Sequence, residues 1–285
     1  MLSHVARFEL RYQATSAIFW ITSLIFFGMT FWFVASDTLR VGWGGYVVRN
    51  SPYTVALNSM IMAVFAIFIV TAFVSNVILR DDETRFGPII RVTELTKFDY
   101  LFGRFLGAFG ASSLVFLSVP LGAMLAAAMP GLDAETVGPF RADAYLYAYV
   151  VLCLPTLFIL GACLFTVATV TRSMLAPYVA ALVAVMVYLL SARYINQASV
   201  REWAALLDPF GLSAFKLATQ YWTPSERNAQ LAPITGAMLQ NRALWLSIAL
   251  ALLAWTWRAF LRSPSEGKAP KPDAAADEGA RQSSR

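Results

Sequence analysis

The side chains that most often do chemistry are scarce in this sequence. His4 is the only histidine, so an H-E-x-x-H zinc site cannot form and a Ser-His-Asp triad would have to recruit this residue near the chain start. None of the four lysines completes the phosphate-binding pattern G-x-x-x-x-G-K-[S/T]; they are Lys97, Lys216, Lys268 and Lys271. The sequence therefore predicts no catalytic residue, no metal site and no cofactor site in this chain.

The two cysteines, Cys153 and Cys163, lie ten residues apart in one apolar run. On a helix this separation is a rise of about 15 Å, which is too long for a disulfide. No neighbouring residues complete a metal site. We expect both cysteines to be packing residues.

The densest group of charges, RDDETRFGPIIRVTELTKFDYLFGR, occupies residues 80–104 between two uncharged runs. Each charge would cost about 2.5–3.5 kcal/mol in hydrocarbon, so the polar face of this segment must meet water or another protein. Gly87 and Pro88 divide it. The apolar spacing in residues 89–102 predicts a short amphipathic helix along the membrane surface, with a solvated loop as the alternative.

This charged segment has the composition of a docking element, because binding hot spots combine large apolar side chains with a polar surround. The candidate apolar anchors are Ile89, Ile90 and Phe98. The candidate charged row, at spacings of three residues, is Arg91, Glu94 and Lys97.

The chain as a whole has the composition of a membrane protein. Of its 285 residues 58% are hydrophobic and only 14% are charged, whereas soluble domains carry about a quarter charged residues. The net charge of +5 does not indicate nucleic-acid binding, because the basic residues flank apolar runs, as topology signals do.

The uncharged runs predict an all-α bundle with six membrane spans. They lie at residues 12–36, 50–79, 105–132, 144–171, 173–192 and about 240–261. The last depends on Arg242, Arg258 and Arg262 extending toward the membrane surfaces. Residues 1–262 should form one domain, followed by a disordered tail at 263–285.

Shorter elements should flank the spans. The apolar residues Val5, Phe8 and Tyr12 would lie on one face of a helix, with charged residues on the other face. This pattern predicts an interfacial helix leading into the membrane. The run that follows is too long for the apolar core of a signal peptide. Between the fifth and sixth spans, residues 199–222 predict two short helices divided by Asp208-Pro209, with a mobile loop as the alternative.

The charge distribution predicts an orientation. Six spans place both termini, residues 80–104 and the turn at Arg172 on one side, which holds 14 of the 22 Lys and Arg residues against 8 on the other. The positive-inside rule assigns that side to the cytoplasm. The spans carry no charge at mid-depth, which argues against an ion-coupled carrier.

Small residues and prolines predict how the spans pack. Gly103, Gly107 and Ala111 form a row that allows close helix approach, either within the subunit or across a dimer. Kinks in the third, fourth and fifth spans are expected at Pro120, Pro155 and Pro177.

This arrangement resembles the permease subunit of ABC-2-type exporters. The run TRFGPIIRVTELTKFDYLFGRFLGAF resembles the family's stretch in which G-[R/K]-x-x-G leads into span three. The run LLDPFGLSAFKLATQYWTPSERNAQLAPITGAMLQNRALW is similar to a bacterial subgroup in which the permease is joined to an M1-type aminopeptidase domain. The resemblance covers about residues 1–262; the sequence ends at Arg285 without a zinc motif, so any peptidase activity would belong to another polypeptide.

The resemblance implies a permease in the bacterial inner membrane, with both termini in the cytoplasm. Residues 80–104 would dock on a separate cytoplasmic ATPase that binds ATP and magnesium, and the permease would pair with a second copy or a related permease. The alternative is a membrane anchor or receptor whose outer segment, residues 193–242, binds a protein partner. An integral membrane enzyme is a third, weaker hypothesis because catalytic residues are missing. The sequence does not indicate a substrate.

Overall fold

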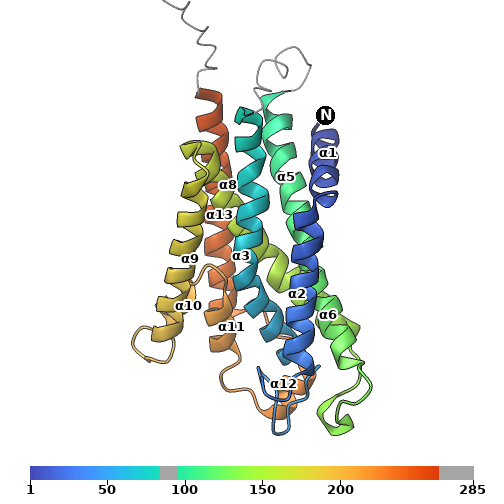
Figure 1. Ribbon diagram of the computed structural model, residues 1–285. Helices are drawn as coiled ribbons and strands as arrows, with labels where there is room; N and C mark the ends of the chain where they lie inside the picture. Colours follow the sequence, from blue (N-terminus) through green and yellow to red (C-terminus); the bar gives the residue numbers. More distant parts are fainter. Residues whose placement is uncertain (84–95, 263–285) are drawn as a thin grey trace, which may run out of the picture.

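A computed structural model describes residues 1–83 and 96–262 (Figure 1). In these ranges the chain consists of helices joined by loops, and its one β-type pairing is an isolated bridge between Gly44 and Val47. The elements are α1 (Leu2–Ala14), α2 (Ala17–Ala35), α3 (Pro52–Glu83), α5 (Lys97–Phe116), α6 (Ser118–Ala127), η1 (Ala134–Thr136), α7 (Ala142–Tyr147), η2 (Ala148–Cys153), α8 (Leu154–Thr171), α9 (Leu175–Tyr194), α10 (Arg201–Leu207), α11 (Leu212–Ala218), α12 (Pro224–Ala229) and α13 (Gly236–Arg262).

The predicted all-α membrane bundle is confirmed. Six helical stretches among the described residues are long and apolar enough to cross a membrane: Ala17–Ala35, Pro52–Ser75, Lys97–Ala127, Ala142–Thr171, Leu175–Tyr194 and Gly236–Phe260. Five of them overlap the predicted runs closely. The third begins at Lys97 rather than at residue 105, so the end of the charged segment belongs to the spanning helix itself.

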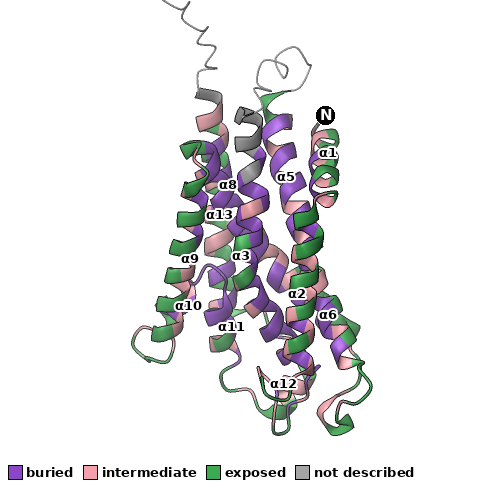
Figure 2. Cartoon of the chain, in the orientation of Figure 1, coloured by how far each residue is buried: buried purple, intermediate pink, exposed green. Residues whose placement is uncertain are grey.

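The second, third and fourth spans form the interior of the bundle, and the first, fifth and sixth form its outside. Of the most apolar 18-residue stretch, 72% is buried in α3, against 22% in α2 and 17% in α9. Figure 2 shows the same contrast between buried α3 and largely exposed α9.

Two of the three prolines predicted to kink the spans coincide with a change in helix geometry. The third span breaks at Leu117, between α5 and α6, three residues before Pro120. The fourth adopts the π-helical turn η2 immediately before Pro155. Proline crowds the preceding turn and removes a hydrogen bond, so a change of helix type there is expected. Pro177 lies in the first turn of α9, where no such bond is lost; the kink predicted at Pro177 is wrong.

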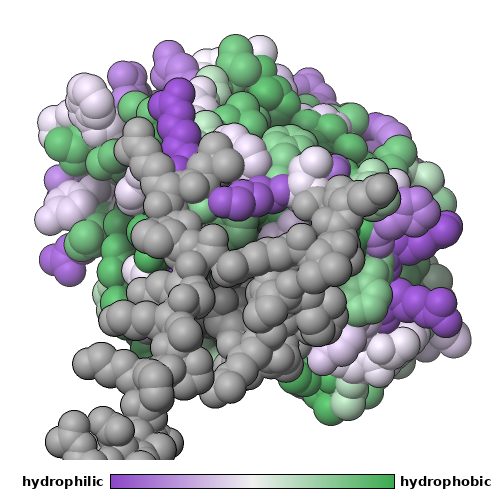
Figure 3. Space-filling model, turned by 90° about the horizontal axis from the view of Figure 1, so that it is seen from above, coloured by the Kyte–Doolittle hydropathy of each residue, from purple (hydrophilic) through white to green (hydrophobic). Residues whose placement is uncertain are grey.

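The chain start, the beginning of α5 and the end of α13 lie at one end of the bundle (Figure 1), called here the N-terminal end. Hydrophilic and hydrophobic residues are interspersed on this end when it is seen from above (Figure 3). The loops before α3, α7 and α13 lie at the opposite end. This up-and-down arrangement places the chain start, the end of α3, the start of α5 and the end of α13 together, as the predicted six-span topology requires.

The N-terminal helix α1 packs along α5 with a face that the sequence assigned to the polar side. Phe8 and Tyr12 are exposed, whereas Glu9 is fully buried and forms an ion pair with Arg104. The amide of Gln13 donates to Glu9 at 2.7 Å. The predicted separation of apolar and charged faces is therefore wrong at Glu9, because the partner that compensates its charge lies on another helix.

The predicted row of small residues is what lets α1 approach. Gly103, Gly107 and Ala111 are all buried. A Cβ atom on Gly103 would lie 2.6 Å from the Cβ of Val5, and one on Gly107 would lie 2.7 Å from the carbonyl oxygen of Ala6. For the two glycines, close approach occurs within the subunit.

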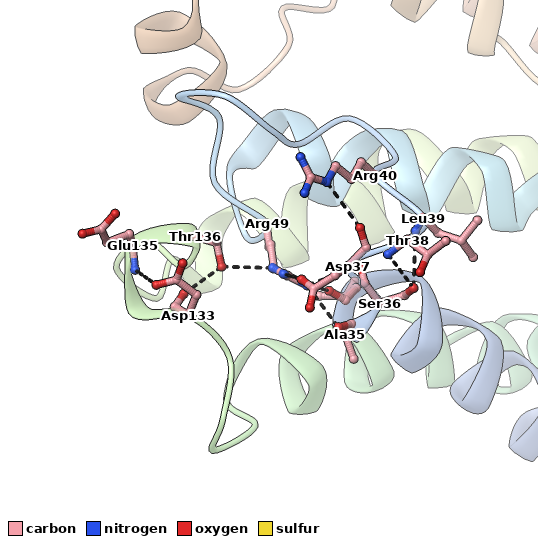
Figure 4. Close-up of polar contacts among 11 residues, drawn as sticks. Ala35, Ser36, Asp37, Thr38, Leu39, Arg40, Arg49, Asp133, Glu135 and Thr136 are labelled. Atoms are coloured by element: carbon pink, nitrogen blue, oxygen red, sulfur yellow. Dashed lines mark hydrogen bonds and ion pairs between the residues drawn. The ribbon is translucent and has the colours of Figure 1, made fainter.

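At the opposite end, Arg49 ties the outer loops to α2 (Figure 4). Its buried guanidinium donates to the carbonyl oxygens of Val34 and Ala35 at 3.0 and 3.1 Å and pairs with Asp37. Its Nε atom donates to the hydroxyl of Thr136 at 3.0 Å. The last carbonyls of a helix lack partners and carry partial negative charge, so a cation there satisfies both needs.

The contact between α1 and α5 gives a matched pair of substitutions. Gly107→Ala would place a methyl group against the backbone of α1, whereas a Cβ on Gly110 would meet only Leu10 at an ordinary 3.5 Å. We expect Gly107→Ala to lower the free energy of unfolding by about 1–3 kcal/mol and Gly110→Ala to leave it nearly unchanged. Thermal unfolding of the detergent-purified protein measures both; equal stabilities would contradict this packing.

Candidate functional site

The predicted docking residues are only partly within the described ranges. Ile89, Ile90, Arg91 and Glu94 lie outside the described residues. Lys97 and Phe98 form the start of α5 and are exposed. The helix begins here because the hydroxyl of Thr96 accepts a hydrogen bond from the backbone N–H of Asp99 at 3.0 Å.

Phe98, a predicted docking residue, contacts the spanning helix α13. Its ring centroid lies 4.5 Å from that of Phe102 and 5.4 Å from that of Trp257 on α13. Tyr100 stacks on Phe260 at 6.1 Å. Because Phe98 is 45% exposed, part of its ring remains available to a partner. The first turn of α5 is thus joined to the last turns of α13.

The outer segment contains the two predicted short helices, α10 and α11. They pack into the bundle, against α9 and α13. The most buried side chains of the segment are 0–1% exposed and include Ala205, Phe210, Leu212, Ala214 and Phe215. The turn at residues 208–215 is thus an inserted part of the core, whereas Trp203, Leu207 and Tyr221 of the same segment are exposed.

The sequence did not identify the polar network beside this segment. Arg242 was expected to extend toward the membrane surface, but its side chain points inward and the residue is only 5% exposed. Its Nη1 atom donates to the hydroxyl of Thr156 on α8 at 2.8 Å. The guanidinium occupies the space that a side chain on Gly211 would need.

The turn between α10 and α11 is held by hydrogen bonds from the same region. The buried carboxylate of Asp208 accepts from the backbone N–H groups of Phe210 and Ser213, at 2.9 and 2.7 Å. The amide of Asn241 donates to the carbonyl oxygens of Ala205 and Asp208, both at 2.8 Å. Adjacent residues of α13, Asn241 and Arg242, therefore hold both sides of the turn.

Burial and charge oppose each other at Asp208. Burial raises the pKa of this carboxyl above its ordinary value, while the hydrogen bonds from Ser213 and Phe210 and the charge of Arg242 lower it. Within the described residues no direct ion pair joins Asp208 to Arg242. The opposite charges of Asp208 and Arg242 attract each other across the turn at residues 208–211. This attraction favours the position of Gly211 beside the guanidinium.

The position of Arg242 in the sequence explains why it was expected to extend toward the membrane surface. The apolar run begins just after it, which is the usual pattern of a flanking arginine. However, α13 begins at Gly236, so Arg242 lies about 9 Å along the helix axis. At that depth an arginine either extends outward or requires buried partners. Thr156, 86 residues away in the sequence, provides one.

An apolar cavity of about 170 Å³ lies next to this network. Pro209 and Trp245 line it together with side chains from α3, α8 and α9, namely Ile67, Ile159, Leu160, Cys163, Leu164, Ala180, Val183, Ala184 and Val187. No cluster of side chains that could hold a metal ion occurs among the described residues.

Comparison with models of known protein families gives no match to the chain, and comparison with curated proteins gives none. Function must therefore be inferred from the sequence and from this geometry.

Gly211 offers a direct test of the packing around Arg242. Gly211→Ala adds a methyl group that collides with the guanidinium, at a backbone φ of +74°. Gly236→Ala is the matched control, because Gly236 also has positive φ, +52°, but open space around it. We expect Gly211→Ala to cost about 1–3 kcal/mol more unfolding free energy than Gly236→Ala, measured by thermal or denaturant unfolding. Equal losses would mean that backbone strain alone accounts for the effect.

Proposed function

We propose that this chain is the permease subunit of an ATP-driven exporter of the ABC-2 type. A separate cytoplasmic ATPase would bind ATP and magnesium and dock on residues 80–104, and the permease would pair with a second copy or a related permease. The chain would lie in a bacterial inner membrane with both termini in the cytoplasm.

The observation that carries the proposal is the position of the charged segment. It is the densest cluster of charges in the sequence, it lies between the second and third spans, and its run into α5 resembles the docking stretch of the family. Within its described part, residues 96–98 at the start of α5 are exposed, whereas Tyr100, Leu101 and Arg104 are buried. The start of α5 lies at the N-terminal end of the bundle. The positive-inside rule favours a cytoplasmic location for that end.

The contacts of α5 supply a route by which docking would reach the rest of the bundle. A shift of its first turn would act on α13 through Phe98 and Trp257. One turn further on, Arg104 is paired with Glu9 of α1. The helices that would move are α5, α13 and α2, which follows α1. They pack against α3 and α8.

The buried turn at residues 208–215 favours an exporter over the receptor alternative. Phe210, Leu212 and Phe215 are buried in the bundle and are not displayed to a partner, whereas Trp203, Leu207 and Tyr221 of the same segment are exposed. A segment inserted between spans is placed to close or open a path through them.

The docking proposal is tested by two substitutions in the charged segment. Phe98→Ala removes an apolar side chain whose full burial is worth about 1.5–3 kcal/mol, and Glu94→Lys reverses a charge in the predicted row. We expect each to reduce co-purification of a P-loop ATPase about 10-fold or more, with membrane insertion unchanged. Leu114→Ala is the control, because Leu114 is equally exposed on the same helix far from the segment.

The readout is the ATPase recovered with permease purified from native membranes in mild detergent, normalised to the inserted permease. Undiminished recovery with both Phe98→Ala and Glu94→Lys would remove residues 80–104 as the docking element and with it the main support for an exporter.

A further inference from the structure

The guanidinium of Arg242 has one complete hydrogen-bonding edge without a partner. Its Nη1 atom donates to Thr156, but Nε and Nη2 have no partner among the described residues, although both atoms are buried. The N–H groups of Nε and Nη2 are parallel and lie on the same edge of the planar group. That edge is the fork with which arginine binds a carboxylate or a phosphate through two hydrogen bonds.

The nearest carboxylate does not fill this fork. The oxygens of Asp208 accept from Phe210 and Ser213, and no ion pair joins Asp208 and Arg242 within the part of the chain that is described. The side-chain oxygen of Asn241 is likewise buried without a partner. Buried polar groups are nearly always satisfied, and the partner whose geometry matches both N–H groups of this fork is a carboxylate or a phosphate.

On both α8 and α13, residues that line the apolar cavity follow the residues of the Arg242–Thr156 hydrogen bond by about one helical turn. On α8, Ile159 and Leu160 line the cavity and follow Thr156 by three and four residues, which places them on the same helix face. On α13, Trp245 lines it and follows Arg242 by three residues. Pro209, also in the lining, lies two residues before Gly211, which covers the guanidinium.

We propose that Arg242 and this cavity together bind an anionic amphiphile. Its carboxylate or phosphate would accept two hydrogen bonds from Nε and Nη2, and its hydrocarbon chain would occupy the apolar cavity. Because the fork is buried, the turn at residues 208–211 must shift to admit the anion. This inference rests on the proposed function in one respect: it names the class of molecule that the exporter would carry.

Binding is tested with three probes that share one dodecyl chain bearing a photoreactive diazirine: a carboxylic acid, a phosphate monoester and an alcohol. The full chain is reconstituted without any ATPase in phosphatidylcholine nanodiscs, and labelled residues are identified by mass spectrometry. We expect both anions to label the cavity residues of α8 and α9 saturably. The alcohol should label them at least about 10-fold less, the range expected for hydrogen bonds to a charged group.

Two matched pairs of variants separate the fork from the cavity. Arg242→Gln should reduce anion labelling about 10-fold, whereas Arg258→Gln, at an exposed position of the same helix, should leave it unchanged. Ala184→Phe, which fills the cavity from α9, should reduce labelling by both anions, and Leu182→Phe on the exposed face should not.

Equal labelling of the cavity by acid, phosphate and alcohol in the unmodified protein would overturn the proposal, whatever the stability of the variants. Labelling that Arg242→Gln does not change would overturn it as well. Discrimination by either anion supports it. Because the assay contains no ATPase, its failure leaves the exporter proposal standing, and loss of ATPase association leaves anion binding standing.

Discussion

A buried positive charge must be compensated by nearby polar groups, and this requirement determines where the non-spanning parts of the chain lie. Hydrophobic burial alone orients helices weakly in a membrane, since lipid is as apolar as the helix surface. Three buried arginines, Arg49, Arg104 and Arg242, provide the direction that burial lacks. Arg49 is compensated by the end of α2 with Asp37, and Arg104 by Glu9 of α1, while Arg242 donates to Thr156 beside the turn at Asp208 and keeps one edge open. The outer loops, α1 and the inserted helices α10 and α11 are each placed by one of these arginines.

The same contacts connect the two ends of the bundle. The last turns of α13 pack on the first turn of α5 through Trp257 and Phe98, while its second turn carries Arg242 against Gly211. A helix about 40 Å long thus has one end beside the charged segment and the other beside the buried network. In the proposed exporter, docking of an ATPase at one end would be felt at the inserted turn on the other, where we place anion binding.

The sequence predicted the spans because their signal is local: about 20 uncharged residues have few alternatives to crossing a membrane. The two short helices around Asp208-Pro209 were predictable for a similar reason, from apolar spacing and a proline. The orientation of charged side chains was not. Arg242 was expected to face outward and Glu9 to face solvent, because their partners, Thr156 and Arg104, lie 86 and 95 residues away. Pro177 was misjudged because its effect depends on where α9 begins. The anchors Ile89 and Ile90 fall outside the described residues and stay a prediction, as does the docking role of Phe98.

The most direct measurement is a double-mutant cycle on the buried ion pair between Glu9 and Arg104, with unfolding free energy as the readout. If buried arginines position the flanking elements, Glu9→Leu and Arg104→Met should each cost about 3–5 kcal/mol, because each leaves an uncompensated charge inside the protein. The double substitution should then regain most of that loss, since it removes both charges together. Small single effects that simply add in the double variant would show that the pair is not coupled, and would contradict this account of how α1 is held against α5.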